Sequence, residues 1–325
     1  DGIESVSDCH DLNDKVGSLP GKHKLVLSSF YRVAAPNATA GNVCNFMPLY
    51  DFIPERMQIP LSPSQSEHLR AKTGNLPLTN GFLSLSNNTT EDLEALHGIS
   101  RLFVATSPNR VSPLFKPMSR NLPFDYANVF PGADHSRLFD FNSGTKYILL
   151  NGYEAGGMEY KGYDLFWEAL ARMPHSFQSE FAVLNIGKQP SHPELNIVSQ
   201  LWSLGNVEEE ILPHIYSRAA VFVYPSRYEG FGMPPIEAIA CGCPVILGGF
   251  YRARMRYVYG DDALYAATVE EMVAALHTVA RGEVASAATL VARAQRYGGD
   301  ERYGWNEVAR DYLEYMLTGP FREVP

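Results

Sequence analysis

Short apolar runs alternate with amphipathic segments along the chain, and this alternation predicts β-α units around a parallel sheet. The pattern is clearest in the second half. The strands predicted there are "KYILLNG" (146–152), "EFAVLNIG" (180–187), "VFVYPS" (221–226) and "CPVILGG" (243–249). The helices predicted between them are 163–173, 208–219 and 234–241. The second half is therefore predicted to form an open, doubly wound α/β sheet.

The first half carries a similar pattern. Its predicted strands are 23–30, 42–52, 81–86 and 101–107, and Asn88 with Glu91 is predicted to form a helix capping box. Because 325 residues exceed the usual size of one domain, we expect two. The predicted parts are an amino-terminal domain at 1–140, a carboxy-terminal domain at 141–305, and a returning helix and tail at 306–325.

Composition narrows the class of partner. A formal net charge of −9 argues against a broad basic face, so nucleic acid is not expected as a partner. The four cysteines lack the paired spacing of a zinc site and are too few for a disulfide scaffold. No apolar run reaches the length of a membrane span, so we expect a cytoplasmic protein. The basic segment "YRARMRY" (251–257) is expected to be a solvated loop, with contact to an anionic lipid-linked acceptor at a membrane surface as the alternative.

The stretch "SRYEGFGMPPIEAIACGCPVILGG" (226–249) is the strongest candidate site. A glycine-bearing turn follows a predicted strand, and two prolines stand where a helix begins. The amides of Gly230, Phe231 and Gly232, together with the positive helix end, predict a cradle for a diphosphate. Glu229 and Glu237 flank the cradle, where carboxylates accept hydrogen bonds from sugar hydroxyls or, alternatively, only cap the helix and face solvent.

Seven residues separate Glu229 from Glu237, and this stretch resembles the E-x7-E motif of the retaining family 4 glycosyltransferases. Further segments follow in the family's order, including "YDFIPER" (50–56), "YKGYDLFWEAL" (160–170) and "LGNVEEEILPHIYSRAAVFVYPS" (204–226). The resemblance covers about residues 24–317. It implies the GT-B fold, which has two Rossmann-like doubly wound domains, here with a shortened amino-terminal domain.

The resemblance implies transfer of a sugar from a nucleotide-diphosphate donor to a carbohydrate or lipid-linked acceptor hydroxyl, with retention of configuration. Lys161 would hold the diphosphate, Glu229 the sugar hydroxyls and Glu237 the ribose hydroxyls. The other implied donor-binding residues are Gly230, Phe231, Gly232, Val207, Tyr50 and Asp51. A cation and a helix amino end would stabilise the departing diphosphate, so neither a metal nor a further cofactor is expected.

The chain departs from the family pattern in three ways. Tyr153 and Glu154 stand where members usually carry an arginine on the diphosphate, and Arg227, Lys188 or Arg218 would have to replace it. Tyr50 and Asp51 stand where many members have a histidine close to the transferred sugar. The amino-terminal domain is short, so either the family's first β-α units are not represented in this sequence, or a homo-oligomer or a second chain supplies them.

Two other classes of function remain open in the sequence. The departures above are the reason to consider a non-transferring, regulatory homologue that binds sugar nucleotides on the same fold. A dinucleotide oxidoreductase shares the β-α pattern but needs G-x-G-x-x-G after a strand, and "GFGMPP" lacks the third glycine. The oxidoreductase is therefore the weakest of the three hypotheses.

Overall fold

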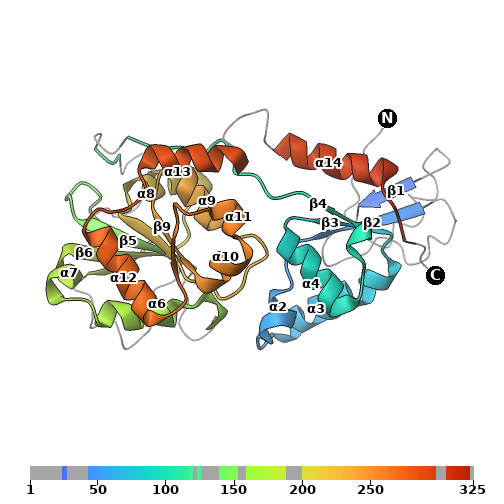
Figure 1. Cartoon of the computed structure of the whole chain (residues 1–325), viewed down its shortest axis with the longest axis horizontal. Helices are drawn as coiled ribbons and strands as arrows, with labels where there is room; N and C mark the ends of the chain where they lie inside the picture. The colour runs from blue at the N-terminus through green and yellow to red at the C-terminus, as the bar shows by residue number, and fades with distance from the viewer. Residues whose placement is uncertain are drawn as a thin grey trace. The chain divides into compact units, whose positions relative to one another are not determined.

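The computed structural model of the chain divides into two compact units (Figure 1). Unit 1 is Asp1–Asn109 together with Asn306–Pro325, and unit 2 is Arg110–Trp305. The residues described are 24–27, 43–119, 123–125, 139–152, 159–187, 200–297 and 305–322. The predicted strand at 23–30 lies partly outside them.

Unit 1 contains a four-stranded parallel sheet in the order β1-β2-β3-β4. Its strands are β1 (Lys24–Leu27), β2 (Val43–Leu49), β3 (Gly81–Ser84) and β4 (Val104–Thr106). Its helices before the chain leaves the unit are α2 (Ile53–Met57), α3 (Pro63–Asn75), η1 (Leu76–Leu78), α4 (Asn87–His97) and η2 (Arg101–Phe103). The core forms where apolar residues of β2 and β3, such as Met47 and Phe82, meet Leu93 of α4. The predicted capping box of Asn88 with Glu91 is wrong, because the side chain of Ser86 caps α4 by accepting from the Thr89 amide.

The carboxy-terminal helix α14 (Trp305–Thr318) returns to unit 1. The hydroxyl of Tyr312 donates to the carbonyl oxygen of Ser84 at 2.9 Å, and the Ser107 hydroxyl donates to Asp311 at 2.7 Å. The ring of Tyr315 packs edge-on against Phe46, with 6.2 Å between ring centroids. Unit 1 is thus built from two pieces of chain far apart in sequence.

Unit 2 contains a six-stranded parallel sheet in the order β10-β9-β8-β5-β6-β7. The strands are β5 (Lys146–Asn151), β6 (Phe181–Ile186), β7 (Leu201–Ser203), β8 (Val221–Tyr224), β9 (Val245–Gly248) and β10 (Leu264–Ala266). The chain moves outward from β5 to β7 and then crosses back to β8, so the strand order reverses between β5 and β8. Ligands of open parallel sheets bind outside the carboxyl ends of the strands at such a reversal.

Helices cover both faces of this sheet. They are η4 (Glu159–Lys161), α6 (Tyr163–Ala171), α7 (His175–Glu180), η6 (Glu209–Ile211), α8 (Leu212–Arg218), α9 (Met233–Ala240), α10 (Gly249–Arg254), α11 (Arg256–Tyr259), α12 (Val269–Ala280), α13 (Ala287–Ala294) and η7 (Gln295–Tyr297). The main core joins buried strand residues such as Ile148 and Val223 to Phe166 and Trp167 of α6 and Leu276 of α12. Because the strands are buried on both faces, they appear in the sequence as continuous apolar runs.

Two parts of unit 2 differ from the sequence expectation. The segment 251–257 is helical, within α10 and α11, and is not a solvated loop: Arg252 pairs with Glu271 at 2.8 Å and Arg256 pairs with Asp261. The described residues of 110–140, assigned above to the amino-terminal domain, lie in unit 2.

Candidate functional site

The turn that carries Lys161 is fixed against the end of β8. Gly162 has a φ of 69°, a left-handed conformation that suits glycine, and it turns the chain from η4 into α6. A Cβ at Gly162 would collide with the carbonyl oxygen of Pro225. The Arg227 amide also donates to the carbonyl oxygen of Tyr160 at 2.7 Å. The segments that follow β5 and β8 are therefore held together at the reversal of strand order.

Lys161 and Glu229 meet at this point. The Lys161 ammonium donates to Glu229 Oε1 at 2.8 Å and to the Tyr224 hydroxyl at 2.7 Å. The same carboxylate oxygen accepts from the hydroxyl of Tyr224 at 2.9 Å and from that of Ser226 at 2.8 Å. Glu229 is only 7% exposed, so these three donors supply the hydrogen bonds that a buried carboxylate requires.

The hydroxyl of Tyr224 is protonated and acts as a hydrogen-bond donor in this cluster. Burial first, and then the charge of Glu229, raise the pKa of Tyr224 well above its usual value. The hydroxyl therefore keeps its proton at neutral pH and can give it to Glu229 while accepting from Lys161. Neither Tyr224 nor Ser226 was among the residues predicted from the sequence. The available signal was their position, at and just after the end of an apolar strand, within five residues of Glu229.

The turn before α9 contains Gly230, Phe231 and Gly232, and all three are buried. Gly232 has a φ of 87°, and a Cβ there would collide with the hydroxyl of Tyr251. The Tyr259 hydroxyl donates to the carbonyl oxygen of Gly232 at 2.7 Å and to that of Phe231 at 3.2 Å. The backbone of this turn is thus held by the core of unit 2.

Glu237 lies in α9 with a half-buried side chain. Burial, and secondarily the charge of Glu209, raise the pKa of Glu237 to about 7. Among the described residues, no hydrogen bond or ion pair to its carboxylate is found. Val207 is also half-buried and precedes η6, the element that carries Glu209. A hydrogen-bond donor that approaches Glu237 therefore stabilises the ionised form of its carboxylate.

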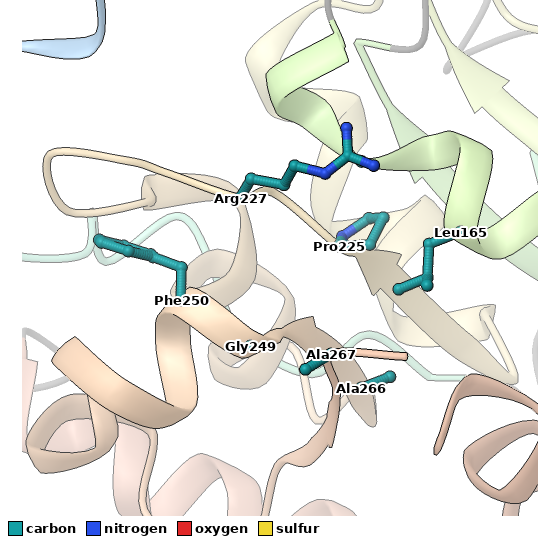
Figure 2. Close-up of a pocket in the computed structure, with 8 residues that line it drawn as sticks. Leu165, Pro225, Arg227, Gly249, Phe250, Ala266 and Ala267 are labelled. Atoms are coloured by element: carbon teal, nitrogen blue, oxygen red, sulfur yellow. The ribbon is translucent and has the colours of Figure 1, made fainter. Parts of the chain in front are cut away.

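The cations considered as replacements for the missing arginine are engaged elsewhere. Arg227 forms an ion pair with Asp164 at 2.5 Å, and its guanidinium points away from Phe250 (Figure 2). Arg218 donates to the carbonyl oxygen of Ser119 at 3.0 Å and lies 5.2 Å from the ring centroid of Phe124. Tyr153, Glu154 and Lys188 lie outside the described residues. Of the candidate diphosphate-binding cations that the structure describes, Lys161 contacts Glu229.

A cavity of about 200 Å³ opens at the carboxyl ends of β8, β9 and β10 (Figure 2). Its lining residues are Gly162, Leu165, Pro225, Arg227, Gly249, Phe250, Ala266 and Ala267. The cavity shares Gly162 with the turn that presents Lys161, so it lies beside that turn.

Tyr50 and Asp51 follow β2 and belong to unit 1. The Tyr50 side chain is exposed, and Asp51 Oδ1 accepts from the Ile53 amide at 3.0 Å. Lys72, which is buried, donates to the carbonyl oxygen of Asp51 at 3.4 Å and pairs with Glu55. This lysine fixes the turn that presents Tyr50 and Asp51.

Within the described ranges, no cluster of three or more histidine, cysteine or acidic side chains is arranged to hold a metal ion. The same part of the chain contains no helix with both the length and the apolar character needed to span a membrane.

The chain is similar in sequence to known glycosyltransferases. Residues 153–281 match the family model described as glycosyl transferases group 1. The chain is 32% identical over 193 residues to mannosylfructose-phosphate synthase of Agrobacterium fabrum, covering 51% of this chain and 41% of that protein. It is 48% identical over 63 residues to O-antigen chain mannosyltransferase B of Escherichia coli, covering 19% of this chain and 16% of that protein. The chain thus matches less than half the length of each of these relatives.

The fold is also found among solved structures. An Anabaena protein crystallised in complex with UDP-glucose matches with a TM-score of 0.60 over 85% of this chain and 72% of that chain, at 16% identity. Two parallel α/β units, the second with a polar cluster at its strand-order reversal, define the GT-B class of fold, as expected from the sequence. In sequence and fold the chain is GT4-like, and residues 153–281 of its second unit are similar to the glycosyl transferases group 1.

Proposed function

We propose that this protein is a retaining hexosyltransferase that moves a sugar from a nucleotide-diphosphate donor to a hydroxyl of a carbohydrate or lipid-linked acceptor. The observation that carries the proposal is the Lys161–Glu229 pair at the strand-order reversal, beside the start of α9. Lys161, Glu229 and Glu237 all lie within the region that matches the family model. The relatives named as mannosyltransferase and as mannosylfructose-phosphate synthase support sugar transfer as the reaction class.

In the proposed reaction, the acceptor oxygen forms a bond to the anomeric carbon of the donor sugar and gives its proton to the departing diphosphate oxygen. The bond from that carbon to the diphosphate breaks, and its electron pair remains on the diphosphate oxygen. Lys161 and the amides at the start of α9 stabilise the negative charge that develops there. This role requires no metal ion, in line with the expectation from the sequence.

We assign the remaining donor contacts in the same way. Glu229 accepts from hydroxyls of the transferred sugar, Glu237 accepts from the ribose hydroxyls, and Val207 contacts the base. The amides of Gly230, Phe231 and Gly232 bind the phosphate or the sugar. Donor binding by Tyr50 and Asp51 stays a prediction, as do a peripheral position at a membrane and a homo-oligomeric or two-chain assembly.

The proposal is tested first by binding and then by turnover. UDP, GDP, ADP and dTDP are screened by thermal shift, because a ligand that binds only the folded state raises the melting temperature. Glucose and mannose esters of the tightest nucleotide are then incubated with a panel of saccharide and lipid-linked acceptors. We expect release of the nucleoside diphosphate and a product whose one-bond C1–H1 coupling in NMR shows the same anomeric configuration as the donor.

A second candidate function is a regulatory homologue that binds sugar nucleotides without transferring sugar. Tyr153 and Glu154, in place of the family's arginine, are the observation that favours it. Tight nucleotide binding without release from any donor, with or without acceptor, would support this alternative and contradict the transferase proposal.

A further inference from the structure

The carboxylate of Glu229 is surrounded by two hydroxyls as well as by Lys161, and the proposed function gives those hydroxyls no task. Tyr224 is the last residue of β8, and Ser226 follows two positions later. Both are buried, with exposed fractions of 3% and 0%. Their hydroxyls donate to the oxygen that also receives the Lys161 ammonium. Their positions are set by the central strand and therefore do not depend on a ligand.

Under the proposed function, on which this inference rests, two groups compete for the Lys161 ammonium: the Glu229 carboxylate and the donor diphosphate. In the structure its ammonium is bonded to Glu229 and Tyr224. A donor diphosphate carries more negative charge than one carboxylate, so it attracts this ammonium away from Glu229. A buried carboxylate that loses its cation is costly unless other donors remain.

We propose that Tyr224 and Ser226 are positioning residues that hold Glu229 in its sugar-binding orientation once Lys161 has transferred to the diphosphate. Each is an uncharged donor that gives one hydrogen bond to the carboxylate, at 2.9 and 2.8 Å, and this bond does not depend on Lys161. The Lys161–Glu229 pair is then the resting arrangement of the site, and donor binding exchanges the partner of the lysine while the carboxylate stays in place.

The exchange predicts the effect of removing the charge of Glu229. Glu229→Gln keeps the shape of the side chain but no longer competes for the Lys161 ammonium. We expect the affinity for the nucleoside diphosphate to increase about three- to tenfold in this variant, and the added affinity contributed by the hexose to disappear.

The positioning role is tested by comparing two dissociation constants for each variant. The probes are the tightest of UDP, GDP, ADP and dTDP, and its glucose and mannose esters, measured by calorimetry. The ratio of the two constants is the gain in affinity from the hexose. In Tyr224→Phe and Ser226→Ala we expect this gain to fall about tenfold, while the affinity for the nucleoside diphosphate stays within about threefold of wild type.

Tyr147→Phe is the matched control. Tyr147 is a buried tyrosine of the neighbouring strand β5, and its hydroxyl donates to the carbonyl oxygen of Ile215 at 2.5 Å. Tyr147→Phe also removes a buried tyrosine hydroxyl that donates a hydrogen bond, here to a backbone carbonyl, so a merely structural effect of such a loss appears in both tyrosine variants. We expect Tyr147→Phe to keep the full gain from the hexose.

The outcomes separate this inference from the proposed function. If the wild type binds none of the four nucleotides, the proposed function and the inference both fail. If the wild type binds and gains affinity from a hexose, but Tyr224→Phe and Ser226→Ala keep that gain, the inference alone is overturned. A hexose that adds no affinity in the wild type overturns the sugar contact of Glu229 and, with it, the positioning role.

Discussion

At the scale of single residues, Lys161 is the described cation of the site, and its replacement tests the diphosphate contact directly. In Lys161→Ala we expect the affinity for the nucleoside diphosphate to fall by about 10- to 100-fold, as for loss of a charged hydrogen bond worth about 1.5–3 kcal/mol. The affinity for the nucleoside alone should change little, because it lacks the phosphates. Isothermal titration with both ligands provides the measurement.

The control for this variant is Lys146→Ala. Lys146 lies on β5 and forms an ion pair with Glu180, with more than half of its side chain exposed. Removing it deletes the same type of charge from the same unit without touching the site. Equal losses of affinity in the two variants would show that the effect is one of net charge and not of a contact.

Glu237 gives a prediction for the pH dependence of stability. Its pKa in the folded state is about 7, above the value of 4.5 for an ordinary glutamate. The folded state therefore holds the proton more tightly than the unfolded state, and the free energy of unfolding falls as pH rises from about 4.5 to 7. Urea unfolding at pH 5 and pH 8 should show this decrease in the wild type. The decrease should be smaller in Glu237→Gln, which cannot titrate; an equal decrease in both proteins excludes Glu237 as its source.

At the scale of elements, the start of α9 depends on a backbone conformation that glycine alone adopts without strain. Gly232→Ala combines the cost of a positive φ with a collision against Tyr251, and we expect it to lower the free energy of unfolding by about 2–4 kcal/mol. Gly282→Ala is the control, because Gly282 has a φ of 69° but no atom within 4 Å of an added Cβ. It should cost only about 1–2 kcal/mol.

Chemical denaturation measures both glycine variants, and a double variant separates the two costs. Adding Tyr251→Phe to Gly232→Ala removes the atom nearest to the added Cβ, so part of the lost stability should return. If the two glycine variants lose equal stability, the collision with Tyr251 is not a constraint on this turn.

The same elements show what the sequence could predict. Buried parallel strands are continuous apolar runs, so β5, β6, β8 and β9 were predicted to within about two residues at each end. The helices α10 and α11 were missed because three arginines made the segment look like an exposed loop. Arg252 pairs with Glu271, 19 residues away, and Arg256 pairs with Asp261, five residues away, so neither pair has the spacing of a helical repeat.

The candidate site was predictable in its spacing but not in its hydrogen bonds. The seven residues between Glu229 and Glu237 are visible in the sequence, as is the turn that precedes α9. The bond from Lys161 to Glu229 spans 68 residues and depends on the order of strands in the sheet. The roles of Tyr224 and Ser226 depend on their hydrogen bonds to one particular oxygen of Glu229, and the sequence does not reveal these bonds.

At the scale of the whole molecule, each unit has its own hydrophobic core. Phe82 is buried in the core of unit 1, and Phe166 is buried in the main core of unit 2. Replacing either by alanine should cost about 3–5 kcal/mol. We expect calorimetry to resolve two transitions, with Phe82→Ala lowering one and Phe166→Ala lowering the other. A single transition that both variants shift equally would contradict the assignment of two cores.

The return of α14 to unit 1 also determines the order in which the units can form during synthesis. The ribosome completes residues 110–305, all of unit 2, before it makes the helix that packs against Phe46 and Ser84 of unit 1. Unit 2 is one continuous stretch and is complete once Trp305 has been made, whereas the sheet of unit 1 is made before unit 2 and its helix α14 after it. The part of the unit 1 sheet that α14 covers therefore stays uncovered while the ribosome makes unit 2.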